Sequence, residues 1–369
     1  MISLGDFTGS VGNFGTILPL LVAISVTSGM SLSLMLLLCG GWYILSGIIY
    51  KVPVSVEPLK AVAAISIAGH FSPEIIIASG ILIGVFFIFL GVFHGMDLIQ
   101  HHIPSSVVRG LQLGLGFILL KSSLLDFGLL DKPSFIIGIL CIVLVYLFRR
   151  IRQTPDFSAL LLFVLGIACV LYSYGIPQLN PPVLPTLVLP AISDFNTAGM
   201  NLVLPQIPIT IANAILATSL LISDLYQYKV SPNKLSISVG CMSLTTSMLG
   251  GFPLCHGAGG VAAHRRFGGK SGYTMIIGGV ILIWLASLFT NPALIQSFPQ
   301  GLFGVLLMVV AAELIAQGIR TDNRFISGCM VLIAIFGGMA LSFIGGVIIA
   351  MAYPHLETYI SRKGLQRRI

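Results

Sequence analysis

A glycine- and proline-rich stretch, Gly250-Gly-Phe-Pro-Leu-Cys-His-Gly-Ala-Gly-Gly260, lies inside a long apolar part of the chain. A regular helix facing lipid does not have this composition, because a bilayer offers no water to backbone groups that are left unpaired. Broken helix is tolerated at membrane depth only where it is buried in protein or lines a cavity. The stretch therefore predicts an interrupted transmembrane segment at a binding site.

A corresponding interruption, Pro53-Val-Ser-Val-Glu-Pro-Leu-Lys60, breaks an apolar run in the first half of the chain. Pro53 to Ala64 aligns with Pro253 to Ala263 with a single one-residue offset. Two corresponding broken segments, one in each half, are typical of a transporter built from an internal repeat.

The composition is that of an integral membrane protein. Hydrophobic residues make up 56% of the chain and charged residues 8%, whereas soluble proteins have about 25% charged residues. The N-terminus lacks the positively charged start of a signal peptide, so we expect the first apolar segment to stay in the mature protein. The lipid bilayer is therefore the first predicted partner.

Fourteen apolar segments can be delimited. They cover residues 11–28, 30–50, 54–69, 74–93, 106–120, 134–148, 158–175, 205–223, 235–250, 253–263, 271–290, 302–316, 325–340 and 341–352. The third and tenth are shorter than the roughly 20 residues of a full span and are predicted to be half-helices.

The longest weakly apolar connection separates seven segments from seven, so the second half enters the membrane from the opposite side. We predict an all-α integral membrane protein with a 7+7 inverted repeat. Its predicted parts are a first repeat (1–176), a Pro-rich connection (177–204), a second repeat (205–356) and a basic cytoplasmic tail (357–369).

The basic residues are distributed unevenly. With a cytoplasmic N-terminus, fifteen Lys and Arg residues fall on the inside and only Lys121 and Lys132 on the outside. This bias predicts a multi-pass protein of the cell membrane with both termini in the cytoplasm. It also explains the net charge of +7 without nucleic acid as a partner.

The sequence offers little support for a metal, a cofactor or a disulfide. The six cysteines are scattered through apolar segments without metal-ligand spacing and are interpreted as buried thiols. His94, Asp97, His101 and His102 gather in one predicted cytoplasmic connection, which is interpreted as a solvated loop.

Polar residues at membrane depth are costly and therefore mark candidate functions. Asn13 and Thr16 share one helix face in the first segment, and Gln206, Thr210 and Asn213 recur at helical spacing in the eighth. Both stripes are consistent with a central cavity that holds substrate. Hydrogen bonding between helices is the alternative.

The two half-helices begin with groups suited to an anion. Glu57 and Lys60 open the first, near its positive dipole end. The second opens with a run that leaves backbone N–H groups accessible, made up of Cys255, His256, Gly257, Ala258 and Gly259. Facing each other, two such ends predict a cradle for a small anion. The alternatives are a neutralising Glu57–Lys60 pair and a buried structural histidine.

Glu57 is also a candidate proton carrier. Burial and an arriving dianion disfavour its charged form, whereas Lys60 and the helix dipole favour it. Its protonation state would then change on substrate binding, which is a proton-coupling mechanism. A permanent Glu57–Lys60 ion pair is the rival interpretation.

At these residues the chain resembles the molybdate transporter family, distant relatives of the sulfate and nucleobase permeases. The resemblance covers most of the chain and is carried by Gly12 to Pro19, Pro53 to Ala64, Val108 to Gly116, Leu204 to Pro208, Phe252 to Gly260 and Arg266-Phe-Gly268. It implies a core domain (segments 1–4 and 8–11), a gate domain (5–7 and 12–14) and a substrate between segments three and ten.

Two positions depart from that family's pattern. Asn13 stands where the family is expected to have an acid, and Glu57 stands where it is expected to have an amide. If the two face one another, the acid–amide pair is kept with its members exchanged. If they do not, selectivity or ion coupling differs from the family.

We therefore expect a secondary active transporter of a tetrahedral oxyanion, with molybdate as the first candidate, and a homodimer as a candidate assembly. Sulfate or tungstate transport and an anion channel of the same fold are the alternatives. An intramembrane enzyme is disfavoured, because no nucleophile or metal-ligand set accompanies His256 and Glu57.

Overall fold

A computed structural model describes residues 3–99, 104–152, 157–175 and 179–366. The first half contains α1 (Leu4–Ser10), α2 (Phe14–Ser28), α3 (Leu32–Tyr50), β1 (Glu57–Pro58), α4 (Lys60–Gly69), α5 (Pro73–Val92), α6 (Gly95–Ile99), α7 (Ser105–Ser122), the π-helix η1 (Ser123–Gly128), α8 (Lys132–Arg152) and α9 (Ser158–Tyr174).

The second half follows the same plan. It contains α10 (Ile192–Ala198), η2 (Gly199–Val203), α11 (Leu204–Ile209), η3 (Thr210–Ala217), α12 (Thr218–Tyr226), α13 (Pro232–Met248), β2 (Leu254–Cys255), α14 (Ala258–Arg266), α15 (Tyr273–Leu288), α16 (Pro292–Gln296), α17 (Gln300–Gly318) and α18 (Arg324–Gln366).

The described elements form the predicted fourteen segments. The short helices from α10 to α12 follow one another without a break as one segment, and α18 is divided in two by a kink at Gly338, whose φ is 84°. Among the described residues, seven continuous helical stretches are long and apolar enough to cross a membrane. Four further apolar helices, among them α4, are shorter. The predicted all-α membrane fold is confirmed.

The eighth segment begins earlier than expected. Its helix starts at Ile192, where the Asp194 carboxylate accepts a hydrogen bond from the Ala191 amide at 2.9 Å. The predicted connection therefore ends at Ala191 rather than at residue 204. Pro205 and Pro208 are accommodated next to the wider π-helical turns η2 and η3, because proline cannot donate the bonds of a regular helix.

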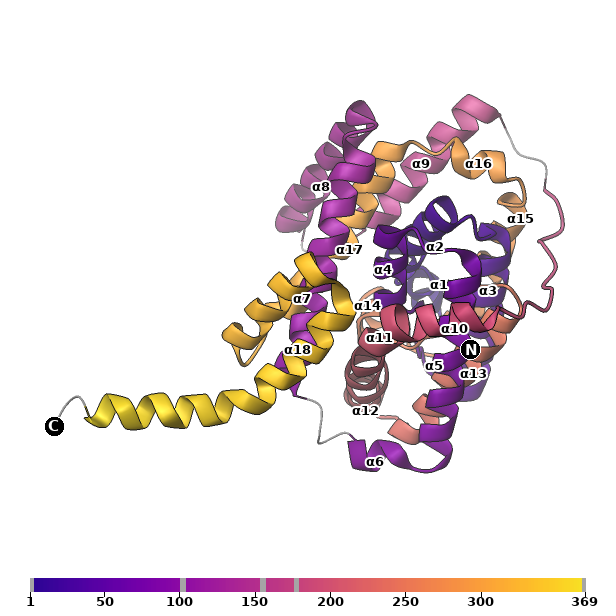
Figure 1. Cartoon of the computed structure of the whole chain (residues 1–369). Coiled ribbons are helices and arrows are strands. Elements are labelled where there is room, and N and C mark those ends of the chain that lie inside the picture. Colours follow the sequence, from indigo (N-terminus) through magenta and orange to yellow (C-terminus); the bar gives the residue numbers. More distant parts are fainter. Residues whose placement is uncertain (1–2, 100–103, 153–156, 176–178, 367–369) are drawn as a thin grey trace.

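The helices form two groups, which are the predicted core and gate domains (Figure 1). In the core, α5 packs on α13 and α3 packs on α15; in the gate, α7 packs on α17 and α18. Small residues allow the helices of the gate to approach closely. A Cβ added at Gly114 would lie 2.9 Å from the Ala334 Cβ, and one at Gly116 would lie 3.0 Å from the Ala311 oxygen.

The two interrupted segments meet at the strands. β1 and β2 pair antiparallel, with Glu57 opposite Cys255 and Pro58 opposite Leu254. The Leu59 amide extends this pairing by donating to the Pro253 oxygen at 3.1 Å. Because α4 and α14 follow antiparallel strands, they leave the crossing point in opposite directions. The two predicted half-helices are confirmed as α4 and α14.

Candidate functional site

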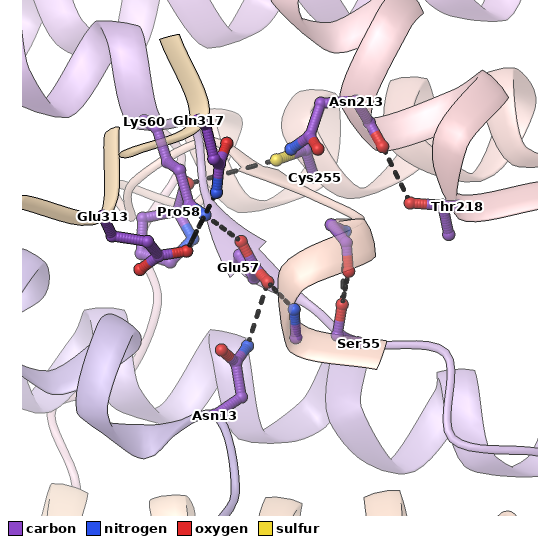
Figure 2. A network of polar contacts seen from close by, with 12 residues as sticks. Asn13, Ser55, Glu57, Pro58, Lys60, Asn213, Thr218, Cys255, Glu313 and Gln317 are labelled. Carbon is purple, nitrogen blue, oxygen red and sulfur yellow. Dashed lines mark hydrogen bonds and ion pairs between the residues drawn. The ribbon is translucent and has the colours of Figure 1, made fainter. Parts of the chain in front are cut away.

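The Glu57 carboxylate lies at the beginning of α14 (Figure 2). Its Oε1 accepts hydrogen bonds from the Asn13 Nδ2 at 3.2 Å and from the Gly260 amide at 3.0 Å. Its Oε2 lies 3.2 Å from the Lys60 Nζ. Positions 13 and 57 thus face one another, which is the arrangement that an acid–amide pair with exchanged members requires.

Two glycines at the beginning of α14, the N-cap Gly257 and Gly260, accommodate this carboxylate. A Cβ added at Gly257 would lie 2.5 Å from the Glu57 carboxylate, and one at Gly260 would collide with Glu57 Oε1 and crowd Asn13. Ser55 ties down the same turn, because its Oγ donates to the Gly257 oxygen at 2.7 Å and accepts from the Gly257 amide at 3.2 Å. The helix dipole of α14 is thereby matched by an internal anion.

The beginning of α4 is capped from the other repeat. The Gln206 Oε1 accepts the amides of Ala61 at 2.8 Å and Val62 at 3.1 Å, while its Nε2 donates to the Thr210 Oγ1 at 2.8 Å. Gln206 and Thr210, two of the polar residues at helical spacing in the eighth segment, therefore form hydrogen bonds within the core domain. Asn213 uses its main-chain oxygen to accept from the Thr218 Oγ1 at 2.9 Å.

His256 is not part of the carboxylate cluster. Its Nδ1 lies 2.8 Å from the Ser55 oxygen and its Nε2 lies 2.9 Å from the Ser238 Oγ. A carbonyl oxygen can only accept, so Nδ1 carries the proton and Nε2 accepts from the hydroxyl. The ring also packs edge-on against Tyr50. This arrangement matches the structural interpretation of a buried histidine.

Cys255 lies in the strand pairing, where its Sγ is 4.0 Å from the Pro58 oxygen. All six cysteines are free thiols. Among the described residues, no group of three His, Cys, Asp or Glu side chains is arranged to hold a metal ion. His94 contacts Asp97 at 3.9 Å and Asn233 at 3.2 Å, whereas His101 and His102 lie outside the described residues.

Glu313 of α17 joins the site from the gate domain, which the sequence analysis did not anticipate. Its Oε1 lies 3.4 Å from the Lys60 Nζ and accepts from the Gln317 Nε2 at 3.2 Å. Gln317 in turn accepts from the Gln112 Nε2 of α7 at 3.1 Å. The available signal was a single carboxylate within an apolar segment, because ionisable residues at membrane depth mark function by default.

A cavity of about 640 Å³ lies between the two domains and reaches this cluster. It is lined by residues of α2, α8, α9, α14 and α17, among them Asn13, Thr16, Gly259, Arg266 and Glu313. The first amides of a helix have no partner within the helix. The amides of Gly257 and Gly260 are bound by Ser55 and Glu57, and the half-buried Gly259 lines the cavity at this turn.

A second cavity of about 740 Å³ lies between the ends of α4 and α7 and the kink of α18. Its lining includes His70, Lys121 and Asp126. Lys121 belongs to the predicted outer side, whereas Arg266 of the first cavity belongs to the predicted inner side. If this predicted orientation holds, the two cavities approach the boundary between core and gate from opposite faces of the membrane.

Comparison with known sequences connects this geometry to transport. The family described as "Molybdate transporter of MFS superfamily" matches residues 5–119 and 198–314. Molybdate transporter 2 of Arabidopsis thaliana is 27% identical, over 93% of this chain and 86% of its own length. Molybdate transporter 1 of Chlamydomonas reinhardtii is 24% identical, over 90% and 88% respectively.

Solved structures show the same fold. The transmembrane domain of the cyanobacterial bicarbonate transporter BicA superposes with a TM-score of 0.66 at 16% identity, covering 94% of this chain and 98% of that domain. The murine anion transporter Slc26a9 in its inward-facing state gives 0.67 at 15% identity, covering 97% and 68%. These similarities confirm the predicted 7+7 arrangement with core and gate domains.

Proposed function

Since the chain belongs to the molybdate transporter family, we propose that it is a secondary active transporter of a tetrahedral oxyanion, with molybdate as the first candidate. The observation that carries this proposal is Lys60, a buried cation that contacts Glu313 at the wall of the interdomain cavity and lies close to Gly259 in the first turn of α14. A cation and helix N-terminal amides together suit an oxyanion. To transport the bound oxyanion across the membrane, the core domain then has to move against the gate domain.

In this proposal the oxyanion binds between Lys60 and the first turn of α14. The amides of Ala258 and Gly259 face it from one side, and Thr16 lines the same cavity. A second set of residues does not contact the oxyanion in this proposal but holds the beginnings of α4 and α14 in place. It consists of Asn13, Glu57, Gly257 and Gln206. Cys255, His256 and Asn213 support the surrounding backbone.

The cavity that reaches this site is proposed to open toward the cytoplasm. The first cavity runs from Asn13 and Gly259 to Arg266, at the end of α14 that the charge distribution places inside. The second cavity reaches α4 at Ile65 and Ala68, beyond the site. An inward-facing state is therefore proposed, with uptake completed by rocking of the core domain between the two cavities.

Uptake into proteoliposomes tests the function. We expect saturable uptake of radiolabelled molybdate, strong inhibition by tungstate, which has the same shape and charge, and weaker inhibition by the smaller sulfate. A proton gradient, acid outside, is expected to accelerate uptake if transport is proton-coupled, and an internal pH dye would report the accompanying protons. Non-saturable molybdate flux that carries current would instead support the anion channel.

Both termini are expected to lie in the cytoplasm, and cysteine labelling from outside intact cells tests this orientation. Single cysteines can be placed at the exposed Lys121 and Lys229 after the six native cysteines have been replaced. An impermeant maleimide applied to intact cells should label the cysteine at 121 and not the one at 229, because the charge bias places Lys229 inside. The reverse labelling pattern would invert the proposed orientation.

A further inference from the structure

We propose that the Glu313 carboxylate is a resident anion of the oxyanion site, which the substrate must displace from Lys60. The proposal rests on the proposed function and deepens it. Glu313 belongs to the gate domain, whereas Lys60 and α14 belong to the core, so the displaced contact is one that holds the two domains together.

The position of the carboxylate carries the argument (Figure 2). Its Oε1 lies 3.4 Å from the Lys60 Nζ and would lie 3.2 Å from a Cβ built on Gly259. The same Gly259 position is 4.0 Å from the Lys60 Nζ. A negatively charged oxygen of this chain therefore already occupies the space between the lysine and the first turn of α14, where the oxyanion is proposed to bind.

The charges around Lys60 require that one carboxylate moves away or is neutralised when the oxyanion binds. Lys60 contacts both Glu57 at 3.2 Å and Glu313 at 3.4 Å, so one cation already faces two anions. Adding a dianion at this depth would place several like charges within a few ångströms of one another, where the surrounding protein screens their repulsion less than water does. Binding is favourable only if a carboxylate moves away or takes up a proton.

Glu313 is the carboxylate that can do so. The Glu57 side chain is 1% exposed and held by Asn13, Gly260 and Lys60, whereas the Glu313 side chain is 35% exposed and faces the cavity. Apart from Lys60, the bond that holds Glu313 is the one from Gln317. It therefore has both the water access and the room to leave.

The other charged groups around Glu313 do not replace Lys60. Arg266 of α14 lines the same cavity, and Arg109 of α7 reaches Glu313 only through Gln112 and Gln317. The described lining contributed by α2, α8 and α9 is uncharged. Glu313 is thus paired with Lys60, which Glu57 of the core also contacts, and neutralising or displacing the Glu313 carboxylate would free Lys60 for the substrate.

The replacement E313Q tests the proposal, because glutamine keeps the shape and the Gln317 contact but removes the charge. We expect the molybdate Kd of the purified protein near neutral pH to fall by about tenfold or more, the scale of one lost charge repulsion. Wild-type affinity should rise as the pH is lowered over a range in which molybdate stays a dianion, and E313Q affinity should stay constant.

Asp126→Asn is the matched control, since it removes one carboxylate from the opposite cavity and should behave like the wild type. An E313Q variant that binds no more tightly than the wild type, or keeps its pH profile, would overturn the inference alone. Wild-type protein that binds no molybdate would overturn the proposed function as well.

A measurement on the wild type covers the case in which E313Q does not fold. Modification of Glu313 by a water-soluble carbodiimide, quantified by mass spectrometry, should increase when molybdate is added, because the displaced carboxylate moves away from Lys60 into the cavity. Labelling of Asp126 is the internal reference. Protection of Glu313 by molybdate, or unchanged labelling, contradicts the displacement.

Discussion

Replacing Gly259 with valine is expected to weaken molybdate binding strongly and leave a folded protein. The added Cβ would lie 3.2 Å from the Glu313 Oε1 and 4.0 Å from the Lys60 Nζ, so the side chain fills the space proposed for the oxyanion. Losing the charge-assisted contact should weaken binding by about 100-fold, or roughly 3 kcal/mol. Binding calorimetry on monodisperse protein measures the effect.

Two neighbouring replacements make this result specific. Ala262→Val adds the same methyl groups to the same cavity wall about one helical turn further along and should retain binding. Gly260→Val should instead prevent folding, because its Cβ would collide with the Glu57 carboxylate. Wild-type affinity in a folded Gly259→Val protein would move the substrate site elsewhere in the cavity.

Replacing Glu57 with alanine is expected to lower the free energy of unfolding by about 2–5 kcal/mol, the cost of two buried donors losing their acceptor. Those donors are the Gly260 amide and the Asn13 Nδ2, at 3.0 and 3.2 Å from Glu57 Oε1. Lys60 keeps Glu313 as its partner, which limits the loss. The midpoint of unfolding in mixed detergent micelles is the measurement.

Glu57→Gln separates the structural role of Glu57 from a role in proton coupling. Its remaining carbonyl oxygen can still accept from Gly260, so a smaller loss of stability is expected than with alanine. Exposed Glu74, in the first turn of α5, is the control site for Glu→Ala. A stable Glu57→Gln protein whose transport no longer depends on pH would make Glu57 the proton carrier and contradict the role proposed for Glu313.

The proposed site was partly predictable from sequence. The Asn13 and Glu57 departures suggested a facing pair, and the structure shows their contact at 3.2 Å. Gly257 and Gly259 looked equivalent in sequence, yet the first accommodates the Glu57 side chain and the second lines the cavity. Their difference depends on which side of the first turn each one faces, and that depends on the neighbouring elements.

The sequence by itself determined the membrane fold, the fourteen segments and the two interruptions, because hydropathy and the placement of Gly and Pro act locally along the chain. The tertiary structure decided which groups at those interruptions stay free. Gln206 caps α4 from 145 residues away, and Glu57 caps α14 across 203 residues. Glu313 reaches Lys60 across 253 residues and from the other domain. Such distant pairings leave no periodic signal in the sequence, because they depend on how the packed helices orient single side chains.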